Sequence, residues 1–134
     1  MKEGIMKNEY ICPYCKGHLK VGNNIIFAIR THNQERGMLL LNPELGNYKW
    51  TKHKSLKLNE GERVETFCPM CHSNLRAINV NKNLAEVIMI DEHGEEYEIF
   101  FSEIVGEHCT FKIHESDVES FGDDSDDYIN YFGS

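Results

Sequence analysis

Short runs of apolar and β-branched residues, separated by clusters of turn-forming residues, make up most of this chain. Such runs of about four to eight positions predict strands. The predicted strands are 24–30, 38–41, 48–53, 63–67, 84–90, 97–101 and 109–113. Residues 102–106 are predicted to make one helical turn that ends at Gly106. We therefore expect a mainly β protein.

Two turns organise these strands into hairpins. Asn, Pro and Gly within residues 42–47 predict a turn between the strands at 38–41 and 48–53. Asp91-Glu92-His93-Gly94 gives a stronger hairpin signal between 84–90 and 97–101. The expected architecture is an inserted β-hairpin region followed by an additional C-terminal β-hairpin.

The last twenty residues differ from the rest in composition. Residues 115–134 contain seven acidic side chains and no basic one, so this acidic tail has little apolar surface to offset the entropy of ordering. We expect one β domain over residues 1–114 and a flexible tail over 115–134. The aromatic residues that close the tail can dock on the domain or enter a partner's groove.

Composition and charge narrow the protein's setting. A chain of 134 residues suits one hydrophobic core, and no apolar run approaches the roughly 20 residues that span a bilayer. Residues 1–8 lack an apolar stretch of signal-peptide length, which predicts a cytoplasmic protein. Residues 1–67 carry a net charge of +4 and residues 68–134 a net charge of −12. The two halves either neutralise one another or present opposite fields to different partners.

One cysteine motif occurs twice. Cys-Pro-x-Cys begins at Cys12 and again at Cys68, and each copy has a leucine four residues after its second cysteine. A glutamate lies three residues before each first cysteine, and an apolar residue directly precedes it. Residues 9–19 and 65–75 therefore read as one structural unit used twice. Leu19 and Leu75 are expected to pack beneath the turns, with Ile11 and Phe67 anchoring the incoming chain.

Two such turns supply four thiolates, which fill a tetrahedral shell. The predicted metal ligands are Cys12, Cys15, Cys68 and Cys71. Zn²⁺ is the preferred cofactor, since it accepts four sulfurs without a geometric preference of its own. The filled shell predicts a structural site without catalytic residues. Iron in the same site is the alternative, and disulfides within the motifs are a third possibility.

Over these two segments the chain resembles the zinc-ribbon and rubredoxin-like families. The resemblance implies two knuckles on β-hairpins that clasp one metal ion, and with iron it implies a one-electron carrier. The chain departs from the families in two ways. A span of 52 residues separates Cys15 from Cys68, and the glycine that often follows the second cysteine is replaced by Lys16 and His72.

Other polar residues invite a chemical interpretation but give weaker signals. His18 and His72 can replace a cysteine ligand or hydrogen bond to one, yet four cysteines already satisfy zinc. Adjacent His108 and Cys109 should point to opposite faces of a strand, which argues against a nucleophile with its base. The aspartates at 123, 124, 126 and 127 lack the spacing of a calcium loop.

The function predicted from the sequence is a non-enzymatic interaction or adaptor module with structural zinc and a protein partner. The alternative is nucleic-acid binding through the basic hairpin 48–57, where Trp50 is interleaved with lysines such as Lys49 and Lys52. Those lysines also suit an exposed sheet edge that discourages aggregation. The acidic tail can lie over this basic strand and compete with an anionic ligand. No membrane partner is expected, and the sequence leaves the oligomeric state open.

Overall fold

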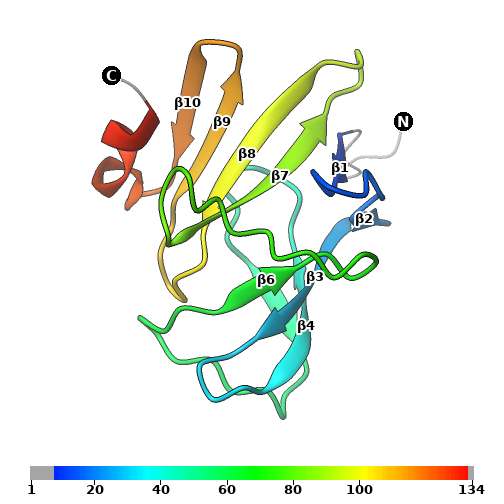
Figure 1. Cartoon of the computed structure of the whole chain (residues 1–134), viewed down its shortest axis with the longest axis vertical. Helices are drawn as coiled ribbons and strands as arrows, with labels where there is room; N and C mark the ends of the chain where they lie inside the picture. The colour runs from blue at the N-terminus through cyan, green and yellow to red at the C-terminus, as the bar shows by residue number, and fades with distance from the viewer. Residues whose placement is uncertain (1–7, 133–134) are drawn as a thin grey trace.

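The computed structural model describes residues 8–132, without the side chains of Asn130 and Tyr131, and consists of two antiparallel sheets (Figure 1). Sheet A has the strand order β1-β7-β8-β9-β10, and sheet B has the order β2-β3-β4-β5. In sheet B, β2 and β6 pair with successive parts of the same edge of β3. The strands are β1 (Glu9–Ile11), β2 (Lys20–Val21), β3 (Asn24–Arg30), β4 (Arg36–Leu41), β5 (Trp50–Lys52), β6 (Glu65–Phe67), β7 (Leu84–Ile90), β8 (Glu96–Ser102), β9 (Thr110–His114) and β10 (Asp117–Phe121). Within the described residues, no helix is long and apolar enough to cross a membrane.

The predicted mainly β fold is confirmed, and the seven predicted strands correspond in order to β3 to β9. The predicted helical turn at 102–106 is wrong. Ser102 ends β8, and Ile104 forms an antiparallel bridge with Arg63. Val64 N–H donates to the Glu103 carbonyl, so the backbone of this segment finds its partners in the chain that leads into β6. Pairing across the molecule therefore replaces the local helical bonds.

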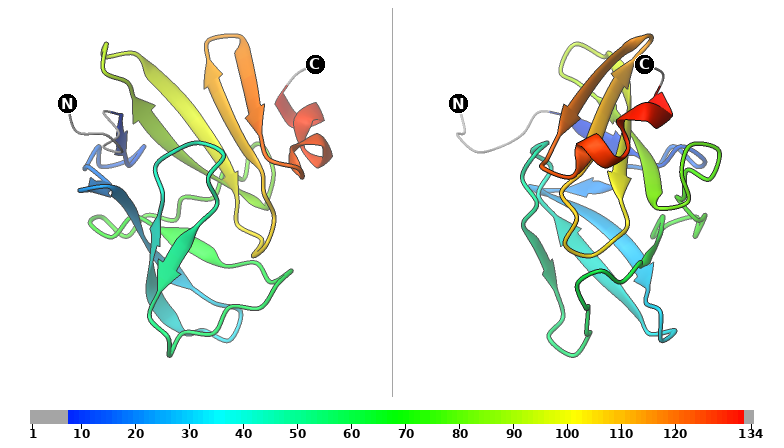
Figure 2. Two further views of the ribbon diagram at one scale, coloured as in Figure 1. Left: turned by 180° about the vertical axis from the view of Figure 1, so that it is seen from behind. Right: turned by 90° about the vertical axis from the view of Figure 1, so that its left-hand side faces the viewer.

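Residues 9–52 and 65–112 follow the same succession of elements, and we call them the first repeat and the second repeat. Each begins with a three-residue strand, passes through a cysteine turn and ends in a meander of three antiparallel strands (Figure 2). The register of the second meander equals that of the first moved by 60 positions. For example, the pair Phe27–Leu39 in the first meander corresponds to the pair Val87–Ile99 in the second. In the same way, the pair Leu41–Trp50 corresponds to the pair Phe101–Thr110.

The two repeats exchange their first strands. Strand β1 of the first repeat pairs with β7 of the second, and β6 of the second pairs with β3 of the first. The two exchanged strands pair in the same register. Tyr10, the middle residue of β1, opposes Met89, and Thr66, the middle residue of β6, opposes Ile29, the equivalent of Met89. One chain thus has the arrangement of a two-fold symmetric dimer with swapped strands. Each cysteine turn consequently crosses from one sheet to the other.

The main core lies between the sheets and draws on equivalent positions of both repeats. In the central strands, alternate side chains point inward, as a strand period of two requires. The buried residues are Ile25, Phe27 and Ile29 on β3, and Ala85, Val87 and Met89 on β7. Leu19 and Leu75 are each only 1% exposed and join this core, which confirms their predicted place beneath the cysteine turns.

A second, smaller core covers the outer face of sheet A. Leu84, Phe100 and Phe111 form it together with Tyr128 and Phe132, which belong to the last residues described. The two 3₁₀ helices there are η1 (Ser125–Asp127) and η2 (Ile129–Phe132). Strand β10 and both 3₁₀ helices thus lie in the segment assigned from sequence to the acidic tail. The domain division itself stays a prediction.

Candidate metal centre

Each cysteine motif forms a tight turn that reverses the chain, and we call residues 12–19 the first knuckle and residues 68–75 the second knuckle. In the first, Lys16 N–H donates to the Cys12 carbonyl at 3.0 Å, and Cys12 N–H donates to the Gly17 carbonyl at 3.0 Å. The second knuckle repeats both bonds with His72, Cys68 and Ser73 in the same places. Two loops of different sequence therefore have the same backbone hydrogen bonds.

The residue after the second cysteine has a left-handed backbone in both knuckles. Lys16 has φ of 62° and His72 has φ of 66°. This is the conformation that glycine adopts at least cost, and it is the position where rubredoxin-like families often have glycine. The departure noted from the sequence is therefore one of residue type, while the backbone conformation is the one that glycine favours.

Four sulfur atoms meet where the knuckles face each other. The Sγ atoms of the two motifs all lie within 4.8 Å of one another. The short distances run between knuckles: Cys12 to Cys71 is 3.7 Å and Cys15 to Cys68 is 3.8 Å. A tetrahedron with metal–sulfur bonds of about 2.3 Å has an edge of about 3.8 Å. The four cysteines are therefore placed to hold one metal ion, and none of them is in a disulfide.

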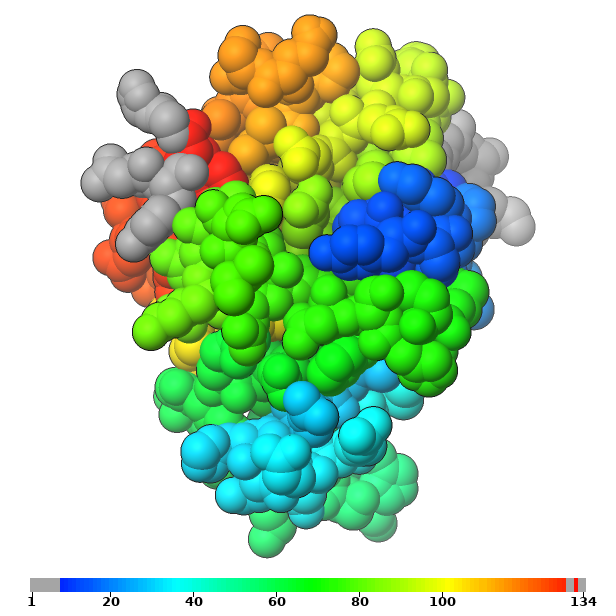
Figure 3. All heavy atoms as spheres, in the orientation of Figure 1, coloured from blue at the N-terminus to red at the C-terminus, as the bar shows by residue number. Residues whose placement is uncertain are grey.

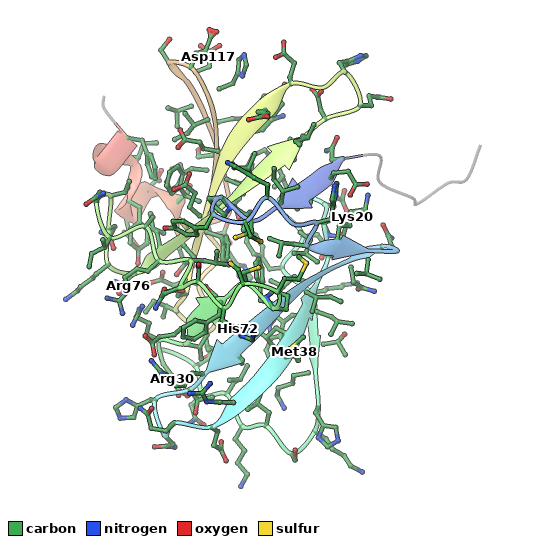
Figure 4. All side chains as sticks on the ribbon, turned by 45° about the vertical axis from the view of Figure 1, so that its right-hand side comes forward. Lys20, Arg30, Met38, His72, Arg76 and Asp117 are labelled. Carbon is green, nitrogen blue, oxygen red and sulfur yellow. The ribbon has the colours of Figure 1, made fainter. Side chains whose placement is uncertain are left out.

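The site opens to solvent on one side. Figure 3 shows the two knuckles, blue and green, next to each other on one face of the molecule, and in Figure 4 the yellow sulfurs gather between these loops near His72. Cys12 and Cys68 are buried, whereas Cys15 and Cys71 are exposed. The first cysteine of each motif thus faces the core, and the second faces water.

Backbone N–H groups point at the sulfurs and favour thiolates. Tyr14 N–H donates to Cys12 Sγ at 3.3 Å, and Met70 N–H donates to Cys68 Sγ at 3.4 Å. Hydrogen bonding with the side chain and backbone of Ser73 lowers the pKa of Cys71 to about 6. Burial raises the pKa of Cys12 to about 12. In the absence of a cation, the exposed thiol of this pair ionises first.

The other candidate residues are not members of the four-cysteine cluster, although His72 directly follows Cys71. His18 Nδ1 is 3.3 Å from a carboxylate oxygen of Glu9. Cys109 is buried in the second core, and burial raises the pKa of its thiol to about 12, so it is a poor nucleophile. His108 is exposed and stacks on Tyr48, with ring centroids 4.5 Å apart. Among the described residues, the cluster suited to a metal ion is the one formed by the four cysteines.

The basic hairpin is an edge of sheet B. Within residues 8–132, strand β5 pairs with β4 alone, and its Trp50 is 42% exposed. Lys49, Lys54 and Lys57 are exposed as well. The arrangement leaves open both readings made from the sequence, a nucleic-acid surface and a solvated edge.

Comparison of the chain with protein-family models, with curated proteins and with solved structures finds no match. The chain's own geometry therefore carries the functional argument.

Sequence reasoning missed one buried ion pair. Glu103 is fully buried and accepts a hydrogen bond from Arg63 at 2.8 Å and another from Thr66 N–H at 3.0 Å. The only sequence signal is a glutamate directly after a strand of apolar residues. The pair forms because Arg63 and Glu103 come together when the segment before β6 bridges Ile104.

Proposed function

We propose that Cys12, Cys15, Cys68 and Cys71 bind one Zn²⁺ as a structural ion, and that the protein is a non-enzymatic interaction module held together by that ion. The observation that supports this best is the pair of short sulfur–sulfur distances between knuckles, 3.7 and 3.8 Å, which fit a tetrahedral shell. Four protein ligands leave no coordination position for a substrate. The metal would supply cross-linking, and no reaction step depends on it.

The position of the site explains why a structural ion matters here. Both knuckles cross between the sheets, so one ion ties together both sheets and both repeats. Structural zinc contributes about 10 to 16 kcal/mol of apparent binding free energy in small domains, which is comparable to the stability of a whole domain. Losing the ion should therefore affect the entire fold.

Metal analysis tests the site. Protein purified without added metal should contain about one zinc per chain and have no visible colour, whereas a rubredoxin-type iron centre would be coloured. Cys68→Ser should lose the metal and its cooperative unfolding. Cys109→Ala is the matched control, because it removes the one cysteine outside the cluster, and it should retain the metal. Full metal content in Cys68→Ser would refute the ligand assignment.

The interaction role is supported by the exposed knuckle tips. Tyr14 and Met70 occupy equivalent positions beside the centre and are 60% and 50% exposed. Large apolar side chains that are exposed at rigid turns suit a protein partner. Crosslinking of the parent protein first identifies a partner. The double variant Tyr14→Ser with Met70→Ser should keep its zinc but no longer crosslink to that partner. Unchanged crosslinking to that partner would count against this surface.

Nucleic-acid binding is the second candidate, and the exposed Trp50 on edge strand β5 favours it. Base stacking on such a ring contributes about 1 to 3 kcal/mol per base. If this candidate is correct, the affinity of the protein for RNA or DNA should fall as the salt concentration rises, and it should also fall in Trp50→Ala or Lys52→Ala. An affinity that does not change with salt concentration or with either substitution would exclude nucleic-acid binding through this hairpin.

A further inference from the structure

An apolar cavity of about 170 Å³ lies between the two sheets, and none of the four cysteines lines it. Its walls come from β3 and β4 on one side and from β7 and β8 on the other. The loop over residues 42–49, seen from behind in Figure 2, and the loop over residues 103–109 form its rim. Both repeats therefore build this space.

The lining consists largely of equivalent residues from the two repeats. Phe27 corresponds to Val87, Leu39 to Ile99 and Leu41 to Phe101. The rim repeats the pattern, because Gly46 and Gly106 have φ of 90° and 93°. Tyr48 and His108, also equivalent, stack with an interplanar angle of 2°. Equivalent residues that touch must lie on either side of the approximate two-fold axis, so the cavity lies at that axis, between the repeats. Sites between two structural units are a frequent place for ligands.

Polar groups at the walls already have partners inside the protein. The Tyr10 hydroxyl donates to the Pro43 carbonyl, and the Glu103 carboxylate is bound by Arg63 and Thr66. The Tyr48 hydroxyl lies 3.0 Å from the Phe121 carbonyl. Among the described residues, the buried side-chain nitrogen and oxygen atoms without a partner are the Nε atoms of Arg63 and Arg76, and neither residue lines the cavity. No lysine or arginine within residues 8–132 lines the cavity, so an anionic ligand would find neither residue there to pair with.

We propose that this cavity binds a small, uncharged, apolar molecule about the size of one aromatic ring. An apolar cavity of about 150 Å³ in another protein takes up benzene or xenon, so about 170 Å³ is enough for such a ligand. An occupant supplies the dispersion contacts that the lining side chains otherwise lack. A space of about 170 Å³ between the sheets suits a small molecule and is too small for a peptide strand.

Benzene is the probe, and benzoate is its charged counterpart. Titrating benzene into isotopically labelled, metal-loaded protein should produce saturable chemical-shift changes that centre on residues lining the cavity. Benzoate should bind at least about tenfold more weakly, because its carboxylate has to be desolvated without a partner. Saturable benzene binding confined to another surface, or equal binding of benzoate, would overturn the proposal.

Filling the cavity is the second test. Val87→Leu adds a methylene group at the wall and should weaken benzene binding at least about tenfold. Val118→Leu makes the same change on the exposed strand β10 and should leave binding unchanged. Leu39→Phe fills the cavity from the opposite sheet, and it is the variant to test if Val87→Leu does not fold. Parent-level affinity in a folded filled variant would refute the proposal. Zinc content measured on the same samples separates this result from the metal site, on which the proposal does not depend.

Discussion

The two repeats share one backbone plan but differ in the residues of their outer faces. Inner positions are apolar in both, as with Phe27 and its equivalent Val87. On the outer faces, Ile26 and Met38 of the first repeat correspond to Glu86 and Glu98 of the second. The second repeat continues into β10 and a helical cover, whereas the first continues through residues 53–64 into β6. The inner faces and the knuckles are thus alike in the two repeats, whereas the outer faces differ in residue type.

One difference lies inside the molecule, at the exchanged strands. The Tyr10 hydroxyl on β1 donates to the backbone of Pro43, while the Thr66 hydroxyl on β6 donates to the side chain of Glu103, the position equivalent to Pro43. The first repeat satisfies its buried hydroxyl with a neutral carbonyl. The second uses a carboxylate, which in turn requires Arg63. The second repeat should therefore be the more sensitive to a single change here.

Glu103→Gln should be the most damaging of the substitutions considered below. Removing one partner of a buried ion pair typically costs about 3 to 5 kcal/mol, and the partial exposure of Arg63 places this case near about 3 kcal/mol. Chemical denaturation of metal-loaded protein measures the loss. Glu119→Gln is the control, since that exposed carboxylate pairs with Lys112 at 3.9 Å and should contribute less than about 0.5 kcal/mol. Equal effects of the two substitutions would contradict the argument.

Phe132→Ala tests the helical cover of the second repeat. The Phe132 ring lies 4.3 Å from the Phe111 ring and 5.0 Å from the Phe100 ring, centroid to centroid. Because Phe132 is only partly buried, truncation should cost about 2 kcal/mol, less than a fully buried phenylalanine. Hydrogen exchange should increase in β8 and β9 and remain unchanged in β3 and β4.

Ile129→Ala serves as the control for that experiment, because Ile129 is exposed and should contribute less than about 0.5 kcal/mol. If Phe132→Ala leaves both stability and exchange unchanged, the end of the chain does not stabilise the second repeat. The flexible tail predicted from the sequence would then describe it better.

The outer-face carboxylates of the second repeat should give it a pH dependence. Burial, followed by the hydrogen bond and charge of Glu98, raises the pKa of Glu86 to about 7. An unfolded glutamate titrates near about 4.3, so the folded state binds more protons between these values. The free energy of unfolding should therefore fall as pH rises through this interval, by about 1 kcal/mol once solvent screening of the half-buried group is allowed for.

Glu86→Gln removes the titrating group and makes the test specific. The variant should be more stable than the parent at about pH 8, and the difference should shrink towards about pH 5. Comparing the two proteins at each pH cancels the pH dependence of the metal site. A stability difference that does not change with pH would disprove the shifted pKa of Glu86.

Much of the fold was predictable because β3 to β9 each carry a local apolar pattern bounded by turn residues. Strands β1 and β2 have three and two residues. Strands β5 and β6 also have three residues each, but they lie within the longer predicted runs 48–53 and 63–67, whereas no such run was assigned around β1 and β2. Strand β10 has the polar sequence DVESF and forms because β9 offers it an edge. The repeat was recognised only over its cysteine units, since the meanders share a pattern of apolar positions with few identical residues. The strand exchange joins Tyr10 to Met89, a pairing that no local signal records.

The cysteine cluster was predictable from residue type and spacing, because a tight turn with two thiols has few other uses. The cavity was not, since residues from both repeats line it and only the strand exchange brings them together. The left-handed backbone at Lys16 and His72 also escaped prediction, because lysine does not signal a positive φ and the enrichment of histidine there is too weak to assign one position.

Substitutions at Lys16 and His72 should have the smallest effect on stability, and they test how similar the two knuckles are. Replacing either Lys16 or His72 by glycine relieves the strain of a left-handed residue, offset in part by the greater freedom of glycine in the unfolded chain. Each variant should gain about 0.5 kcal/mol in free energy of unfolding and keep its metal. Lys82→Gly is the control of opposite sign, because Lys82 is not among the residues with positive φ and its replacement should destabilise. Similar gains at both knuckles would show that the two turns are equivalent in energy as well as in shape. A gain at one knuckle alone would mean that the side chain of the other residue makes a contact whose stabilisation equals the cost of its left-handed backbone.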